Sequence, residues 1–356
     1  MEQIGVLGAG TWGIALARML ANTGNSVTVW SAIEEEIHRL SRSRRHPNLP
    51  GAEIPESIRF TAEIGEACTG QGLILFAVPS PYVRDTARKA APYIAQNQII
   101  VDAAKGIEAS TLFTMTQVIG DELRRENPEK AVRLVALSGP THAEEVARDM
   151  PTTIVSASSD LAAAGAVQDI FMNTCMRVYT NGDIGGVELC GAVKNIIALA
   201  AGMSRGLGYG DNTKAAIVTR GLAEITRLGC AMGYVEQTFT GLAGIGDLIV
   251  TATSVHSRNN RCGELIGQGV PPREAVEKIG MVVEGIHAIP AVLKLSERYG
   301  VEMPIVEAVD SIINGGATPA EAVRELMGRD KKRERFRPLG GGESLEATPH
   351  NSRLKP

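Results

Sequence analysis

Cysteine and histidine are scarce in this chain of 356 residues, with five of the first and six of the second. The cysteines are odd in number, widely scattered and never form a C-x-x-C pair. This argues against a disulfide framework and is typical of reduced thiols in the cytosol. No two histidines stand four residues apart and none clusters with cysteine, so we expect no metal site.

Aromatic residues are also rare, at 4% of the chain, whereas glycine reaches 39 residues. Such a composition favours close packing of helices and sheets over an aromatic-rich sandwich. Hydrophobic residues make up 44%, which supplies a sizeable core and excludes global disorder. The formal net charge is only −4, which argues against nucleic acid or an anionic membrane as the main partner.

The sequence contains no long uncharged hydrophobic run. The nearest candidate for a membrane span, residues 185–202, contains Glu188, Lys194 and Asn195. The first residues lack a basic segment followed by an apolar one, so we expect no secretory signal. These absences predict a soluble, cytoplasmic protein without membrane insertion.

The first half of the chain alternates short β-branched runs with helical patterns. Alternation of this kind predicts an α/β fold, a Rossmann-like sheet with helices on both faces. The expected strands are 4–7, 26–30, 57–60, 72–78, 99–102, 132–137, 152–156 and 177–179.

The pattern changes after about Gly182, beyond which we find helical periodicity and no strand alternation. We therefore expect a dinucleotide-binding domain at 1–182 and an all-helical substrate domain at 183–328. Residues 329–356 are charged, then rich in glycine and proline, and we expect a disordered tail there.

A glycine-rich loop follows the first expected strand and opens the first helix, with glycines at Gly8, Gly10 and Gly13. The first glycine permits a tight turn, the second admits a pyrophosphate, and the third lets helix and strand approach. The helix N-terminus then supplies free N–H groups to the anion. This context predicts dinucleotide binding; the alternative is a glycine-rich turn without a ligand.

The choice between NAD and NADP stays open from the residues alone. A carboxylate after the second strand would bind the ribose of NAD, and a basic residue there would favour NADP. That strand is followed by Ser31, Ala32 and Ile33, which are neither. Glu34 comes slightly late and Arg39 later still.

Lys194 stands alone in an apolar stretch, and on a helix its face would carry small residues, including Gly191, Ala198 and Gly202. We interpret this as a lysine beneath a space that its neighbours do not fill. Burial would depress the lysine pKa from about 10.4 toward the range of acid–base catalysis. The alternative is a lysine that reaches the surface from a helix edge.

Two expected strand ends carry polar groups where open α/β sheets bind ligands. Lys105 follows the strand 99–102 and is a candidate to contact a substrate oxygen or phosphate. Gly139 and Thr141 follow the strand 132–137, and Thr141 with Glu144 would form a capping box. Structural capping and ligand contact are both compatible with this segment.

The helical half contains two further polar segments. Asp247 follows a glycine-rich bend, either as a functional acid or as the N-cap of the next helix. Ser257, Arg258 and Asn259 precede a helical stretch and would suit a phosphate group; the alternative is an ordinary polar loop.

Together these segments resemble the NAD(P)-dependent glycerol-3-phosphate dehydrogenases of the bacterial soluble type. The resemblance covers about residues 1–328, and its motifs occur in the family's order. It is carried by the segments 8–13, 78–80, 104–106, 138–141, 191–195, 241–247, 257–259 and 282–285. It implies hydride transfer between NAD(P)H and dihydroxyacetone phosphate, which yields sn-glycerol 3-phosphate for glycerophospholipid synthesis.

The resemblance also implies roles for individual residues, with Lys194 as the catalytic acid/base. The implied substrate contacts are Lys105, Gly139, Thr141, Lys194, Asp247, Ser257, Arg258 and Asn259. The implied cofactor contacts are Gly8, Gly10, Thr11, Trp12, Gly13, Lys105, Ala143, Arg258, Val282 and Glu284. Many family members carry His or Arg where this chain has Ala32, which favours NAD or dual use over NADP.

Two other functions are compatible with the same residues. One is a hydroxy-acid dehydrogenase on the same two-domain plan, which would need a carboxylate pocket instead of a phosphate pocket. The other is a non-catalytic NAD(H) sensor, although retention of Lys194, Asp247 and Arg258 together argues against it. The apolar helical domain would suit a homodimer.

Overall fold

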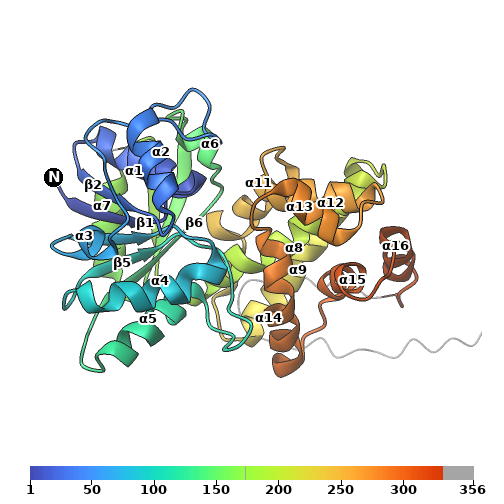
Figure 1. The fold of residues 1–356 in the computed structure, drawn as a ribbon. Helices are drawn as coiled ribbons and strands as arrows, with labels where there is room; N and C mark the ends of the chain where they lie inside the picture. Colours follow the sequence, from blue (N-terminus) through green and yellow to red (C-terminus); the bar gives the residue numbers. More distant parts are fainter. Residues whose placement is uncertain (173, 332–356) are drawn as a thin grey trace, which may run out of the picture.

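A computed structural model describes residues 1–331 except residue 173, and its first half is an eight-stranded sheet (Figure 1). The strands agree with the expected set. They are β1 (Gln3–Leu7), β2 (Ser26–Trp30), β3 (Arg59–Thr61), β4 (Leu73–Phe76), β5 (Ile99–Asp102), β6 (Arg133–Ser138), β7 (Thr152–Ala157) and β8 (Met176–Asn181). The sheet order is β3-β2-β1-β4-β5-β6-β7-β8, and every pair is parallel except β6 with β7.

The strand order reverses between β1 and β4, which are neighbours in the sheet. Ligands of open α/β sheets bind in the crevice beyond the carboxyl ends of the strands at such a reversal. The topology therefore places the glycine loop after β1 and the loops after β4, β5 and β6 at one edge.

Helices cover both faces of the sheet because its strands alternate between two apolar cores. On β4, Leu73 and Leu75 point into one core, and Ile74 and Phe76 into the other. The helices along this half are α1 (Thr11–Asn22), α2 (Glu34–Ser43), α3 (Ile64–Cys68), α4 (Val83–Ala90), α5 (Met115–Glu126), α6 (Ala143–Val146) and α7 (Leu161–Met172), with short 3₁₀ turns η1 (Ser80–Tyr82) and η2 (Ala91–Tyr93).

The second half is helical throughout its described residues and lies beside the sheet (Figure 1). It comprises α8 (Ile184–Gly206), α9 (Asp211–Ala231), α10 (Glu236–Phe239), a π-helical turn η3 (Leu242–Gly246), α11 (Asp247–Thr253), α12 (Arg258–Gly267), α13 (Pro272–Ile279), α14 (Glu284–Tyr299), α15 (Pro304–Ile313) and α16 (Pro319–Met327). This confirms the predicted α/β arrangement followed by helices. The predicted tail lies outside the described residues from 332 onward.

Helix α8 is the centre of this half and packs against α9, α11, α12 and α14. Within the described chain, α8 is the single continuous helix long and apolar enough to cross a membrane, but 83% of its apolar window is buried inside the protein. Residues 236–253 and 258–267 would pass the same test only as one span bent by 48°. Burial of this extent is typical of a core helix.

Glycines let α8 and α12 approach until their backbones touch. A Cβ on Gly202 would lie 2.0 Å from the carbonyl oxygen of Asn260, and one on Gly263 would lie 2.1 Å from that of Leu199. The expectation of unfilled space along the Lys194 face is therefore wrong at Gly202, because α12 occupies it. Ala198 is also covered, in a cluster with Ala252.

This packing makes Gly202→Ala a sharp test. The added methyl would meet a backbone carbonyl that cannot rotate away, so we expect the free energy of unfolding in urea to fall by about 1–3 kcal/mol. The control is Gly165→Ala in α7, where nothing lies within 4 Å of the new Cβ. There the better helix propensity of alanine should leave stability equal or raise it by up to about 1 kcal/mol. Equal losses in both variants would contradict the packing argument.

Candidate active site

The glycine loop has the geometry that its three glycines predict. Gly8 adopts φ +126°, and a Cβ there would lie 2.8 Å from the Ala77 carbonyl carbon. A Cβ on Gly13 would lie 2.0 Å from the Gly8 oxygen, whereas Gly10 has nothing within 4 Å. Gly10 is also the N-cap of α1, and no side chain caps the helix there. The loop thus presents open space and free N–H groups, which fit a pyrophosphate.

Thr11 and Trp12 complete this loop in different ways. The Thr11 hydroxyl accepts a hydrogen bond from Asn48 Nδ2 at 3.2 Å, while Trp12 packs its partly buried ring against the sheet core. Sequence reasoning did not single out Asn48, because it is 37 residues away in a Pro-punctuated loop.

A buried carboxylate joins two lysines at the carboxyl edge of the sheet. Asp247 Oδ1 accepts from Lys194 Nζ at 2.7 Å, and Asp247 Oδ2 accepts from Lys105 Nζ at 2.7 Å. Lys194 comes from α8, Asp247 from the start of α11, and Lys105 from the loop after β5. Asp247 is fully buried and Lys194 is 4% exposed. Three residues predicted separately therefore meet in one cluster, which we call the lysine–aspartate cluster.

The cluster sets the protonation of its members. Burial lowers the pKa of Lys194 to about 7, because the attraction of Asp247 only partly offsets the desolvation and Lys105 repels the charge. Burial alone would raise the pKa of Asp247, but the two ammonium groups outweigh it and hold that pKa below its usual range. The alternative of a lysine at the surface is excluded by this burial.

Asp247 does not cap its helix. It is the first residue of α11, and the preceding π-helical turn η3 runs directly into it. The side chain is therefore free to hold the two lysines. Thr251, one turn later on α11, accepts a further hydrogen bond from Lys194 Nζ. Sequence reasoning missed Thr251, whose signal was its position four residues after Asp247.

The segment after β6 reaches the same cluster through its backbone. The Gly139 carbonyl accepts from Lys105 Nζ at 3.3 Å and from the Thr141 hydroxyl at 3.2 Å. The expected capping box of Thr141 with Glu144 is wrong, since α6 begins at Ala143 and its N-cap is His142. The Thr141 hydroxyl turns back to Gly139 instead of forward into the helix.

The Ser-Arg-Asn segment divides into two structural residues and one unpaired cation. Ser257 caps α12 by accepting from Asn260 N, at 3.2 Å. Asn259 donates to Asn195 Oδ1 at 3.0 Å and accepts from Gly285 N at 2.9 Å, so it joins α12 to α8 and α14. Within residues 1–331, Arg258 has no hydrogen-bond or ion-pair partner. It is half-buried at the first position of α12.

Glu284 at the start of α14 contacts the loop after β4. Its carboxylate accepts from Ser80 N at 3.0 Å and from the Ser80 hydroxyl. Gly106, directly after Lys105, packs against Ser80, because a Cβ there would lie 2.4 Å from Ser80 Cβ. Val282 precedes this contact and is partly buried. Of the cofactor residues expected from the helical half, Glu284 therefore contacts the loop after β4.

Glu188 is a further buried carboxylate that sequence reasoning did not assign a role. From α8 it accepts hydrogen bonds from Thr114 Oγ1 at 2.7 Å and Thr116 N at 2.8 Å, both at the start of α5. Burial raises its pKa even so. Asp102, at the end of β5, is also buried, and burial together with Glu188 raises its pKa well above the ordinary value.

Two models of one protein family match the two halves of this chain. A family model described as the NAD-dependent glycerol-3-phosphate dehydrogenase N-terminus matches residues 3–164, and one described as its C-terminus matches residues 183–324. The chain belongs to the NAD-dependent glycerol-3-phosphate dehydrogenase family. This confirms the resemblance inferred from the motifs.

Individual relatives of the family match over nearly the whole chain. Glycerol-3-phosphate dehydrogenase (NAD(P)+) 2 of Lactobacillus delbrueckii subsp. bulgaricus is 62% identical over 334 residues, which cover 94% of this chain and 99% of the relative. The enzyme of Bacillus subtilis is 46% identical over 335 residues, 94% and 96% of the two chains. The crystal structure of glycerol-3-phosphate dehydrogenase from Coxiella burnetii matches with a TM-score of 0.87 at 36% identity, covering 92% of this chain and 99% of that one.

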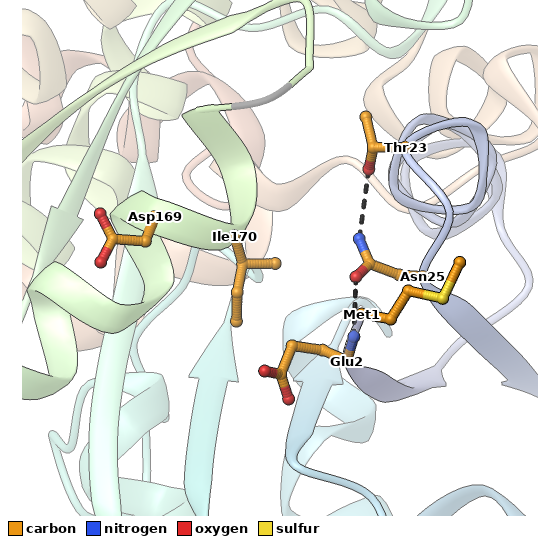
Figure 2. Close-up of a pocket in the computed structure, with 6 residues that line it drawn as sticks. All are labelled: Met1, Glu2, Thr23, Asn25, Asp169 and Ile170. Carbon is orange, nitrogen blue, oxygen red and sulfur yellow. Dashed lines mark hydrogen bonds between the residues drawn. The ribbon is translucent and has the colours of Figure 1, made fainter.

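A separate hollow lies at the opposite edge of the sheet (Figure 2). Glu2 precedes β1 and Asn25 precedes β2, so this hollow is at the amino ends of the strands, away from the carboxyl edge where the lysine–aspartate cluster lies. Asn25 accepts from the Glu2 backbone N and donates to the Thr23 hydroxyl, so its side chain already has partners. No group of three or more metal-ligating side chains gathers anywhere in the described chain.

The lysine–aspartate cluster predicts a pH-dependent stability loss in Asp247→Asn. The pKa of Lys194 is lower in the folded chain than in the unfolded chain, where it is about 10.4. The free energy of unfolding therefore decreases as pH falls below about 10.4, and it levels off once pH is below the folded pKa. With Asp247 present this loss stops near pH 7. Without Asp247 the folded pKa falls further, so the loss continues into the acid range.

We therefore expect the stability deficit of Asp247→Asn relative to the native chain to be about 1 kcal/mol larger at pH 6 than at pH 8. Urea unfolding at both pH values measures it. The control is Asp211→Asn, whose side chain is 92% exposed at the start of α9. A deficit that does not grow toward pH 6 would show that Asp247 does not hold the proton of Lys194.

Proposed function

We propose that this chain is an NAD(P)-dependent sn-glycerol-3-phosphate dehydrogenase, which transfers hydride reversibly between NAD(P)H and dihydroxyacetone phosphate. The observation that carries the proposal is the lysine–aspartate cluster at the carboxyl edge of a dinucleotide-binding sheet. The relatives are named glycerol-3-phosphate dehydrogenases, which supports the same reaction.

The nucleotide, when bound, supplies the hydride that adds to the ketone carbon. We propose that the glycine loop with Thr11 and Trp12 holds its phosphates and that Lys105, Ala143, Arg258, Val282 and Glu284 complete its site. The open backbone at Gly10 and the uncapped start of α1 fit such a ligand.

Lys194 supplies the proton. As an ammonium it protonates the alkoxide oxygen formed during reduction, and in reverse its neutral amine removes the hydroxyl proton of glycerol 3-phosphate. A pKa of about 7 suits both directions, because acid–base catalysis is best when the pKa lies near the working pH. Asp247 and Thr251 hold the ammonium in place between turnovers.

The substrate phosphate requires cations beside the proton donor. Arg258 is a half-buried guanidinium with no partner among the described residues, at a helix N-terminus that favours anions. The remaining proposed substrate contacts are Lys105, Gly139, Thr141, Lys194, Asp247, Ser257 and Asn259. Of these, Lys105 contacts both Asp247 and the Gly139 carbonyl, and Lys194 contacts Asp247.

Three wider statements accompany this proposal. The chain divides at residues 182–183 into a nucleotide-binding and a substrate-binding domain, with a tail from 329. The enzyme works in the cytoplasm and supplies glycerol 3-phosphate for glycerophospholipid synthesis. It assembles as a homodimer.

The direct test follows nicotinamide absorbance with purified protein, dihydroxyacetone phosphate and either NADH or NADPH. Substrate-dependent oxidation is the expected result. If the nucleotide is oxidised in the presence of a keto acid but not of dihydroxyacetone phosphate, the protein is a hydroxy-acid dehydrogenase and this proposal is wrong. Thermal stabilisation by NADH without any oxidation would favour a sensor.

Replacing Lys194 tests the proton donor. In Lys194→Met we expect kcat to fall about 100- to 10,000-fold while the dissociation constant for NADH stays within about twofold, because positioned proton transfer contributes a rate factor of that size. Exposed Lys214→Met is the matched control. In the native enzyme, ketone reduction should decline as pH rises through about 7, since the ammonium is then lost. Near-normal turnover in the methionine variant would exclude Lys194 as the acid.

Replacing Arg258 tests the phosphate site. A charge-assisted hydrogen bond contributes about 1.5–3 kcal/mol, so Arg258→Ala should raise KM for dihydroxyacetone phosphate about 10- to 100-fold. Arg261→Ala, one turn later on α12 and exposed, should leave KM unchanged. An unchanged KM in the first variant would remove Arg258 from the phosphate site.

A further inference from the structure

The carboxyl end of β2 adjoins the glycine loop. Gly8 N donates to the Trp30 carbonyl at 2.9 Å, so the residues directly after β2 stand beside the proposed nucleotide. In dinucleotide-binding sheets a carboxylate at this place accepts hydrogen bonds from the ribose hydroxyls, and a basic residue accommodates a 2′-phosphate.

A carboxylate occupies this place, although no acidic residue directly follows the strand. Glu36, from the first turn of α2, accepts a hydrogen bond from the Ser31 hydroxyl at 2.8 Å. The same hydroxyl accepts from Ile33 N at 3.2 Å, which fixes the turn between strand and helix. The Glu36 side chain is only 19% exposed. The Glu36 carboxylate therefore lies at the end of β2, although Glu36 belongs to the following helix, α2.

The loop that follows α2 also contacts the glycine loop. Asn48 Nδ2 donates to Thr11 Oγ1 at 3.2 Å, and Asn48 N donates to His46 Nδ1 at 3.1 Å. Burial lowers the pKa of His46, and the nearby Glu36 charge opposes that shift. Asn48 thus lies against Thr11 of the glycine loop, with His46 beside it, while Glu36 lies at the end of β2 through its bond to Ser31.

The charges around this region are unfavourable for a further phosphate. Ala32 and Ile33 offer no cation, and Glu34 and Glu35 add two exposed carboxylates on the same turn. Among the described residues, Arg39 is the cation paired with Glu36, at 3.8 Å, and its side chain is 56% exposed. A phosphate placed beside Ser31 would therefore lie next to the Glu36 carboxylate.

We propose that Glu36, held by Ser31 at the end of β2, makes this chain select NAD(H) over NADP(H). The carboxylate accepts hydrogen bonds from the ribose hydroxyls of NAD and repels the 2′-phosphate of NADP. This preference rests on the nucleotide site of the proposed function, and it specifies which nucleotide that site binds more tightly. Glu36 thus takes the role of the ribose-binding carboxylate, which sequence spacing places directly after β2, near Ala32.

Equilibrium binding without any ketone substrate tests this. Nicotinamide fluorescence titrations should give a dissociation constant for NADH at least about tenfold lower than for NADPH, the ratio that one modest repulsive contact produces. Competition by 5′-AMP against adenosine 2′,5′-bisphosphate should show the same order, because the discrimination acts at the ribose. Equal or tighter binding of NADPH by the native chain would overturn the proposal.

Glu36→Gln should weaken the binding of NADH and strengthen the binding of NADPH, so the ratio of their two dissociation constants should move toward one. The matched control is Glu34→Gln, which removes the same charge from the same turn, where the side chain is 75% exposed and faces His38 at 3.5 Å. Glu34→Gln should leave the ratio of the two dissociation constants within about twofold of the native ratio, since exposed charges are screened by salt. Equal changes in both variants would show a general charge effect and overturn the role of Glu36.

Ser31→Ala is a second variant that keeps every charge. It removes the hydroxyl that holds Glu36, and we expect a smaller narrowing of the same ratio. An unchanged ratio would show that the position of Glu36 is not what discriminates. Because these titrations contain no dihydroxyacetone phosphate, selective binding without dehydrogenase activity would refute the proposed reaction and leave the nucleotide preference standing.

Discussion

The shared carboxylate of Asp247 is the interaction on which the two halves of this protein depend. It binds Lys194 from the helical half and Lys105 from the sheet half, so it closes the site across the junction. Two ammonium groups in an apolar interior would be costly without this anion. The same arrangement leaves Lys194 near the pKa at which a proton can move in either direction.

The helical half holds Lys194 in a fixed position. Helix α8 is buried on all sides, and its glycines bring α12 into backbone contact. Glu188 ties the same helix to the start of α5, and Asn259 ties its Asn195 to α14. A side chain on a helix fixed at several points is held more precisely than one on a loop.

Local patterns predicted much of the architecture. The strands were readable because buried parallel strands form short apolar runs, and the glycine loop because its turn requires Gly8 at positive φ. The errors were also local. The capping box at Thr141 failed because α6 begins at Ala143, so its N-cap is His142 and not Thr141. The small residues beside Lys194 proved to be packing surface rather than open space.

The sequence by itself determined the α/β plan, the helical second half, the nucleotide loop and the isolation of Lys194, because each depends on neighbours in the chain. Tertiary structure decided which charges meet. Asp247 is 53 residues from Lys194 and 142 from Lys105, and no periodicity connects such positions. Glu36 likewise reaches the end of β2 only because α2 folds back beside Ser31. The elements follow from local physics, whereas the site follows from their packing.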